Sequence, residues 1–115
     1  MTRIQARLRE MLDAIQRIES YVRPGRDEFF ANELIHSSVL YRLGSLGESA
    51  KGIPSPFRDR HPEIGWKQIT GIRDIVNHKY YGVDLESVWA TVERDLPPLK
   101  AQLLDLLASD PELQE

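Results

Sequence analysis

The stretch TRIQARLREMLDAIQRIESYV, residues 2–22, decides the fold class because its apolar side chains recur with the period of an α-helix. These side chains are Ile4, Leu8, Met11, Leu12, Ile15, Ile18 and Val22. Their spacing of three and four residues forms one stripe, which a globular protein buries against other helices. The pattern predicts a helix from Thr2 to Tyr21, which the Pro24-Gly25 pair ends.

A second helix is predicted from Asp27, a suitable N-cap, to about Ala50. Its apolar residues fall on more than one side, so we expect this helix to be central in the fold. Gly44 and Gly47 lie inside it, three positions apart, and together make a smooth patch. Either another helix packs tightly there, or the backbone of a substrate comes close.

Residues 51–65 interrupt the helical pattern with three prolines and two glycines, leaving room for one short helical turn at about Pro56–Arg60. Arg58, Arg60 and His61 make this connection locally basic. Trp66 then opens a third helix, which ends between His78 and Gly82.

The C-terminal third of the chain predicts two more helices. Asp84 caps the first of them, and Pro97-Pro98 begins the second. Ser109-Asp110-Pro111 ends that helix, and the last residues are expected to fray. No window has the alternation of a strand, so the prediction is an all-α bundle of four to five helices.

The composition of the 115 residues allows a single domain, residues 1–115. The chain has no Cys, which excludes disulfides and thiolate metal sites and fits a reducing cytoplasm. No segment approaches the roughly 20 apolar residues of a membrane span, so no membrane partner is expected. The net charge of −3 counts against a dedicated DNA-binding domain. Residues 1–26 are rich in Arg and residues 84–115 in Asp and Glu, which makes them complementary to each other or to a partner, or simply solvated.

The stretch RDIVNHKYY, residues 73–81, contains the spacing Arg73-x4-His78-x-Tyr80 at the end of the third predicted helix. Because successive helical residues advance by about 100°, Arg73, Asn77 and Tyr80 share one stripe of that helix. Asn77 therefore offers a further polar contact beside the arginine. A cluster of this kind in an otherwise plain helical sequence is the candidate functional site.

These residue types suit RNA cleavage through the 2′-hydroxyl, which needs a base, an acid and a cation at the phosphate. His78 titrates near neutral pH, Arg73 offers a planar bidentate phosphate contact, and Asp74 stands one turn before His78, where it can orient the imidazole. No metal or other cofactor is required, and His36, His61 and His78 are too scattered to form a metal site. The alternative is a surface ion-pair network at a helix end.

With these residues in place, the chain resembles the HEPN superfamily, specifically its HepT-like toxins. The hallmark of that group is Arg-x4-His-x-Tyr, present here at Arg73, His78 and Tyr80. Other family-like stretches are Leu46–Ala50, His61–Trp66, Gly82–Leu85 leading to Val88-Trp89, and Leu96-Pro97. The resemblance covers nearly the whole chain, with its motifs in the expected order.

The resemblance implies an all-helical homodimer in which Arg73 and His78 of both subunits face a shared cleft. It implies a metal-independent ribonuclease acting on tRNA or mRNA. The implied partner is a MntA-like minimal nucleotidyltransferase antitoxin, which in some such pairs adds AMP to the tyrosine equivalent to Tyr80. Asp74 departs from the Asn frequent in the group; it keeps the role of orienting the histidine and adds negative charge near the phosphate.

A second hypothesis is a helical module that binds RNA, a nucleotide or the antitoxin without turnover, and a third is a purely structural dimer. Glu48 is a candidate to hold Arg73 across helices through an ion pair. His36 is expected to be a satisfied, half-buried polar group, and Trp66 and Trp89 are expected to be core anchors.

Overall fold

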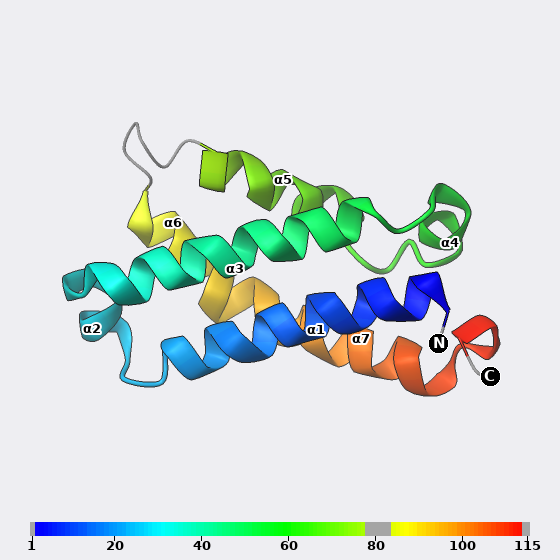
Figure 1. Cartoon of the computed structure of the whole chain (residues 1–115), viewed down its shortest axis with the longest axis horizontal. Helices are drawn as coiled ribbons and strands as arrows, with labels where there is room; N and C mark the ends of the chain where they lie inside the picture. The colour runs from blue at the N-terminus through cyan, green and yellow to red at the C-terminus, as the bar shows by residue number, and fades with distance from the viewer. Residues whose placement is uncertain (1, 78–83, 114–115) are drawn as a thin grey trace.

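The computed structural model describes residues 2–77 and 84–113, and within these ranges every regular element is helical. The elements are α1 (Arg3–Tyr21), α2 (Arg26–Ala31), α3 (Glu33–Lys51), α4 (Ser55–Arg60), α5 (Trp66–Asn77), α6 (Leu85–Ala90), the π-helical turn η2 (Thr91–Asp95), α7 (Leu96–Ser109) and the 3₁₀ turn η3 (Pro111–Leu113) (Figure 1). No helix among the described residues combines the length and the apolar character needed to cross a membrane. The predicted all-α class is confirmed.

Helix α1 forms as its apolar stripe predicts. Thr2 Oγ1 accepts a hydrogen bond from the Gln5 amide (3.0 Å), and Gln5 Oε1 accepts one from the Thr2 amide (2.9 Å). This reciprocal capping box satisfies two amides that would otherwise lack partners at the helix start. The stripe residues Leu8, Met11, Ile15 and Ile18 are fully buried.

The second predicted helix is divided in two, which corrects the expected continuous helix from Asp27. Helix α2 ends at Ala31, and Asn32 adopts an extended backbone whose side-chain oxygen accepts from the Leu34 amide (3.0 Å). Asn32 therefore caps α3. The N-cap of α2 is Gly25, with φ of 105°, so Asp27 lies in the first turn of α2 instead of capping it. Glycine adopts this positive φ without a steric penalty, which lets the chain turn earlier than predicted.

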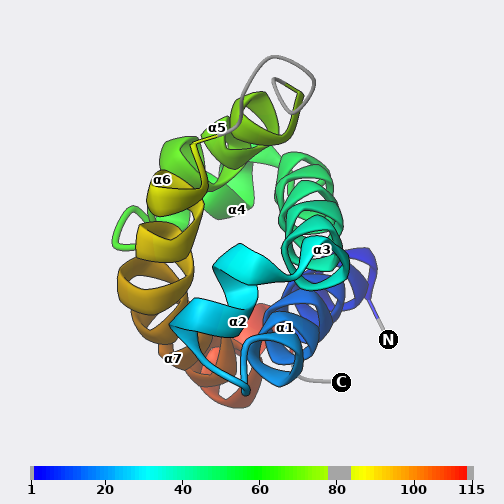
Figure 2. The ribbon, with the colours of Figure 1, turned by 90° about the vertical axis from the view of Figure 1, so that its left-hand side faces the viewer.

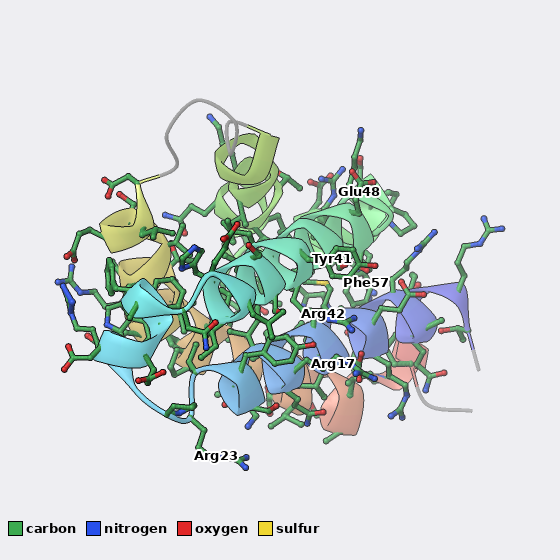
Figure 3. The ribbon with its side chains drawn as sticks, turned by 60° about the vertical axis from the view of Figure 1, so that its left-hand side comes forward. Arg17, Arg23, Tyr41, Arg42, Glu48 and Phe57 are labelled. Carbon is green, nitrogen blue, oxygen red and sulfur yellow. The ribbon has the colours of Figure 1, made fainter. Side chains whose placement is uncertain are left out.

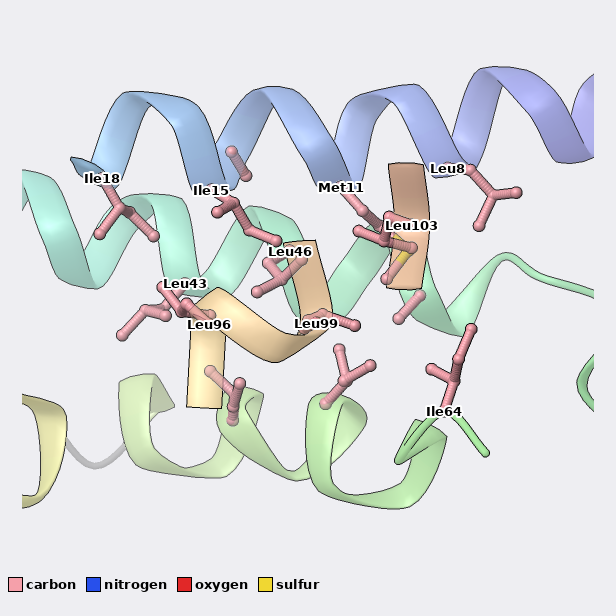
Figure 4. Close-up of a cluster of buried hydrophobic side chains, with 14 of the residues drawn as sticks. Leu8, Met11, Ile15, Ile18, Leu43, Leu46, Ile64, Leu96, Leu99 and Leu103 are labelled. Atoms are coloured by element: carbon pink, nitrogen blue, oxygen red, sulfur yellow. The ribbon is translucent and has the colours of Figure 1, made fainter. Parts of the chain in front are cut away.

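The core lies between the long helices. Helix α3 packs against α1 on one side and α5 on the other, and α7 packs against α1. Figure 2, which looks along the bundle, shows α1, α3, α5, α6 and α7 arranged around this interior. Figure 4 shows the residues that meet there, among them Leu8, Met11, Ile15, Ile18, Leu43, Leu46, Ile64, Leu96, Leu99 and Leu103.

The two predicted C-terminal helices form one run. Helix α6 continues through η2 into α7, and Pro97 and Pro98 lie in the first turn of α7. Proline removes an amide donor and clashes with the carbonyl four residues earlier. The π-helical turn lies just before these prolines, and in it the Leu96 amide donates to the Thr91 carbonyl, five residues earlier.

The chain end described by the structure is packed, so the expected fraying is wrong as far as Leu113. The Leu113 side chain is fully buried, and Gln5 Nε2 donates a hydrogen bond to its carbonyl. Asp110 ends α7 as predicted, and its carboxylate accepts from the Glu112 amide (2.8 Å). These contacts close the end of the bundle over α1.

Candidate functional site

Helix α5 carries the start of the predicted motif. It runs to Asn77, so the helical placement of Arg73, Asp74 and Asn77 in the chain is confirmed. The side chains of these three residues lie outside what the structure describes, and His78 and Tyr80 lie wholly outside the described residues. The convergence of Arg73 and His78 and the Asp74–His78 contact therefore stay predictions.

The N-terminal half of α5 is firmly anchored. Trp66, Ile69 and Ile72 are buried against the core. Trp66 Nε1 donates to the His61 carbonyl (3.0 Å), which confirms Trp66 as a core anchor with its polar edge satisfied. Gln102 Nε2 donates to the Glu63 carbonyl (3.0 Å), so α7 also holds the connection before α5. Arg73 follows Ile72 directly, so the motif begins on a helix that the core holds in place.

The element after the motif is anchored at its first residue. Asp84 Oδ1 accepts from the amides of Glu86 (3.0 Å) and Ser87 (3.4 Å), and Asp84 Oδ2 accepts from Ser87 Oγ (2.8 Å). These bonds, the one from the Ser87 hydroxyl first, hold the pKa of Asp84 below its ordinary value because they stabilise the charged carboxylate. The predicted cap of the fourth helix is confirmed.

An aromatic cluster lies where α2, α3 and α6 meet. The fully buried Phe29 ring lies 5.1 Å from Phe30, 5.2 Å from Trp89 and 6.1 Å from His36, measured between ring centres. Trp89 is half-buried, and its role as an anchor is confirmed. His36 Nδ1 lies 3.0 Å from the Phe29 carbonyl, so His36 is the satisfied, half-buried group that was expected.

A groove of about 490 Å³ lies between α5 and the η2–α7 region. Its α5 wall includes Gln68, Gly71 and Ile72, and its other wall includes Asp95 and Leu99. Ile69, which also lines the groove, lies one helical turn before position 73. The predicted cleft is shared by two subunits and stays a prediction.

Two features of α3 bear on the motif. Gly47 is buried on this helix, which packs along α5, and its burial favours the helix-packing alternative over close approach of a substrate. Gly44 is half-buried. Glu48 is exposed on α3 (Figure 3). Its predicted ion pair with Arg73 lies outside the described residues on the arginine side and stays a prediction.

The basic connection before α5 is engaged in structural contacts. His61 Nε2 lies 2.6 Å from Asp110 Oδ2, and His61 Nδ1 lies 3.2 Å from Glu63 Oε1. Arg60 forms an ion pair with Glu112. Among the described residues no group of three or more His, Cys, Asp or Glu side chains is placed to hold a metal ion.

Sequence reasoning did not single out a cluster between α1 and α3. The Tyr21 hydroxyl accepts a hydrogen bond from Arg42 Nε (3.3 Å). Arg42 first, and then Arg17, lower the pKa of Tyr21 below its ordinary value, although burial acts in the other direction. The spacing of Arg17 and Tyr21, one helical turn apart, was visible in the sequence, but Arg42 joins them only through the packing of two helices.

Comparison with known proteins agrees with the fold and the motif. The model of the ribonuclease HepT-like family matches residues 11–106, a range that includes the whole motif. The "Probable ribonuclease HepT" of Thermococcus cleftensis is 35% identical over 96 residues, which cover 83% of this chain and 87% of that protein. No solved structure matches the chain.

A second relative has a longer chain. The "Gamma-glutamylcyclotransferase and putative RNase" of Methanocaldococcus jannaschii is 36% identical over 101 residues, which cover 87% of this chain. The match covers only 46% of that relative, so this chain spans about half of its length.

Together the helical bundle, the motif and these similarities define the class of this protein as the all-α HEPN superfamily. Within that class the chain belongs to the HepT-like ribonuclease family.

Proposed function

We propose that this protein is the toxin of a toxin–antitoxin pair and acts as a metal-independent endoribonuclease. The observation that carries the proposal is the motif Arg73-x4-His78-x-Tyr80, which falls inside the segment matched by the ribonuclease HepT-like family. Its first residue follows the buried part of α5, and Asp84 caps the helix that comes after it. Anchored elements on both sides suit a site whose groups must be held in place.

The proposed reaction uses the RNA's own 2′-hydroxyl as nucleophile. A base removes its proton, the 2′-oxygen attacks phosphorus, and the bond to the 5′-oxygen breaks as an acid protonates that oxygen. The products are a 2′,3′-cyclic phosphate and a 5′-hydroxyl. His78 serves as the general acid–base, Arg73 stabilises the charge on the phosphate, Asp74 orients His78, and Asn77 adds a polar contact.

The proposed assembly is a homodimer that brings Arg73 and His78 of both subunits to one cleft. The proposed partner is a nucleotidyltransferase-fold antitoxin that transfers AMP from ATP to the Tyr80 hydroxyl and releases pyrophosphate. The added phosphate, close to Arg73 along the chain, would occupy the phosphate site and repel RNA. Glu48 is the proposed support for Arg73.

The test is cleavage of a total tRNA pool in EDTA by protein whose intact mass shows no adduct. We expect wild type to give products ending in 2′,3′-cyclic phosphate and His78→Ala to give none. Removal of a general acid–base typically costs about 10²–10⁴-fold in rate. Equal circular dichroism spectra for the two proteins serve as the control for folding. Cleavage by His78→Ala at the wild-type rate would remove His78 from the reaction.

A non-catalytic module that binds RNA or the antitoxin is the second candidate. Two observations favour it: Asp74 adds a carboxylate beside the phosphate site, and the chain carries a net charge of −3. Absence of cleavage by both proteins, with RNA still bound, would favour this module over the ribonuclease.

A further inference from the structure

The outer face of the α1–α3 pair contains a groove of about 560 Å³. The two helices run antiparallel, because Glu10 contacts Ser49 while Tyr21 contacts Arg42. The polar residues that line the groove are Arg9, Glu10, Asp13, Arg42, Ser45 and Ser49. This face is separate from α5 and from the groove between α5 and α7.

The carboxylates of this groove are already paired. Glu10 Oε2 accepts from Arg7 Nη1 (3.1 Å) and from the hydroxyl of the buried Ser49 (3.1 Å). Asp13 Oδ2 accepts from Arg17 Nε (2.9 Å). Pairing lowers the repulsion that these carboxylates would exert on an incoming anion.

Among the side chains that the structure describes, two arginines on the same face have no carboxylate partner. Arg42 donates through Nε to the Tyr21 hydroxyl, and its guanidinium lies 5.2 Å from the centre of the Tyr41 ring. Arg9 is exposed and lines the part of the groove near Glu10. Guanidinium groups in this state suit phosphate oxygens, which accept two parallel hydrogen bonds from one arginine.

The local charge differs from that of the whole chain. The four arginines of the groove and its rim, Arg7, Arg9, Arg17 and Arg42, face the carboxylates of Glu10, Asp13 and Glu48, an excess of one positive charge. The whole chain carries a net charge of −3. A basic face on an acidic protein favours an anionic partner.

An exposed aromatic ring borders the groove. Tyr41 is 67% exposed on the outer ridge of α3, beside Arg42 (Figure 3). One turn before and one turn after the ring, α3 carries the short side chains of Ser38 and Ser45. Their hydroxyls donate to carbonyls of their own helix, at 2.7 Å and 3.2 Å. An exposed ring next to an arginine that has no carboxylate partner is a combination that binds single-stranded nucleic acid, through base stacking and phosphate contacts.

We infer that the α1–α3 face is a docking site for single-stranded RNA, in which Arg9 and Arg42 contact phosphates and Tyr41 stacks on a base. This inference rests on the proposed function, since it takes RNA as the substrate. The site holds a segment of RNA at a distance from the cleaved bond and so contributes affinity and selection of single strands. It performs no chemistry.

A second copy of the chain is the competing occupant of this face. Leu34 and Tyr41, 76% and 67% exposed and seven residues apart on α3, would also suit a partner helix. A two-fold interface places the same patch on both subunits, however. It would bring the excess positive charge of this face against itself, which an RNA strand would neutralise instead.

The test is binding of a labelled 2′-O-methyl oligoribonucleotide of about 12 nucleotides, followed by fluorescence anisotropy at several salt concentrations. The 2′-O-methyl group prevents cleavage, so the measurement reports binding alone. We expect Arg42→Gln to weaken binding about fivefold to tenfold and to reduce the salt slope by about 0.7, the value for one lost contact to a single strand. Tyr41→Ser should weaken binding about tenfold with the salt slope unchanged.

The matched control is Arg23→Gln, which removes the same charge beyond the end of α1 and away from Arg42 (Figure 3). It should change affinity less than roughly twofold. Arg42→Lys keeps the charge and should keep the salt slope while losing part of the affinity. This second variant covers the case in which Arg42→Gln unfolds the protein.

Four outcomes would overturn the inference. Equal effects of Arg42→Gln and Arg23→Gln would mean that only net charge matters. Conversion of a wild-type dimer to a monomer by Tyr41→Ser, seen by sedimentation, would assign this face to a second copy. Wild type that neither cleaves nor binds RNA would reject the proposed function as well. Cleavage by wild type with unchanged binding by both groove variants would reject only this docking site.

Discussion

At one end of the bundle α4, the start of α1 and the C-terminal turn meet (Figure 1), and charged side chains there surround one buried ring, that of Phe57. At the other end a cluster of rings around Phe29 holds the helices together. We call these the charged end and the aromatic end. The first end holds the His61–Asp110 contact of 2.6 Å and the Arg60–Glu112 ion pair. The second end holds the buried ring of Phe29 against Trp89. Helix α6, which follows the motif, begins at this aromatic end.

The two ends illustrate two ways in which neighbouring helices are held together, by directional polar contacts and by apolar packing. Directional hydrogen bonds to a buried carboxylate fix one geometry and cost free energy if one partner is lost. Apolar packing depends on volume, so a missing ring leaves a cavity that neighbouring elements fill only in part. We therefore expect damage at the aromatic end to reach the motif, and damage at the charged end to affect stability alone.

The largest expected effect is that of Phe29→Ala. Removing this fully buried ring should lower the free energy of unfolding by about 3–5 kcal/mol, because it leaves a cavity beside Trp89. Urea unfolding gives the value, and RNA cleavage per folded molecule should fall as well. Phe30→Ala, which truncates a half-buried ring, is the matched control and should cost clearly less. Equal losses for the two variants would mean that the cluster is not centred on Phe29.

If Phe29→Ala leaves too little folded protein, Phe29→Leu serves the same test with a smaller cavity. A domain of this size has only about 5–15 kcal/mol of stability in total. Cleavage by Phe29→Leu that equals wild type, despite a measurable loss of stability, would contradict the expected link between the aromatic end and the motif.

Asp110→Asn should produce the second-largest effect. The substituted amide can still accept from the Glu112 amide, but the charged contact to His61 is lost. Hydrogen bonds to charged groups contribute about 1.5–3 kcal/mol, so we expect a loss of about 2 kcal/mol in urea unfolding. Cleavage per folded molecule should be unchanged, because the motif starts in the C-terminal half of α5, at the opposite end of that helix from His61.

Glu63→Gln provides the control for Asp110→Asn. Glu63 contacts the same imidazole at 3.2 Å, but its side chain is 55% exposed, against 6% for Asp110. Exposed ion pairs contribute about 0–1 kcal/mol. A loss as large as that of Asp110→Asn would show that burial of the carboxylate does not decide the strength of this end.

The sequence predicted those parts of the fold that depend on local patterns. The apolar stripe of α1, the cap at Asp84 and the short helix α4 all follow from spacing and residue type within a few positions. The break at Asn32 was missed because Phe29 and Phe30 continue the apolar pattern into α3, and an asparagine is tolerated inside a helix as well as at its start. Burial of Leu113 depends on α1, more than a hundred residues away in the sequence.

The functional residues also fall into those that the sequence could predict and those that depend on the packing of helices. The motif from Arg73 to Tyr80 was read from its spacing, because its residues are neighbours in sequence. The contact of Arg42 with Tyr21 could not be read in this manner, since it depends on the antiparallel register of α1 and α3. Whether Asp74 reaches His78 also depends on how the helix ends, which residue types alone leave open.

The next effect in size concerns the cap beside the motif. Because the folded pKa of Asp84 is lowered, its carboxylate stabilises the protein above the unfolded pKa of about 3.9. That stability is lost as the pH falls through the lower, folded pKa. We expect Asp84→Ala to have a lower urea midpoint than wild type at pH 7, with a difference that narrows on acidification. Asp84→Asn, which keeps a cap but does not titrate, is the control; a difference for Asp84→Ala independent of pH would show that the charge has no part in capping.

The smallest effect should come from the ion pair at the aromatic end. Arg26 Nη2 contacts both carboxylate oxygens of Glu86, at 2.6 and 2.7 Å, and the Arg26 guanidinium lies 4.5 Å from the Phe30 ring centre. Both charged side chains are nevertheless about half exposed or more, at 48% and 66%. Water and salt screen such a pair, so Arg26→Gln should cost about 0.5 kcal/mol or less and still less at high salt. A double-mutant cycle with Glu86→Gln isolates the pair from the contact with Phe30. A coupling of several kcal/mol would contradict the comparison of the two ends, because charge and not the Phe29 ring would then hold α6 to α2.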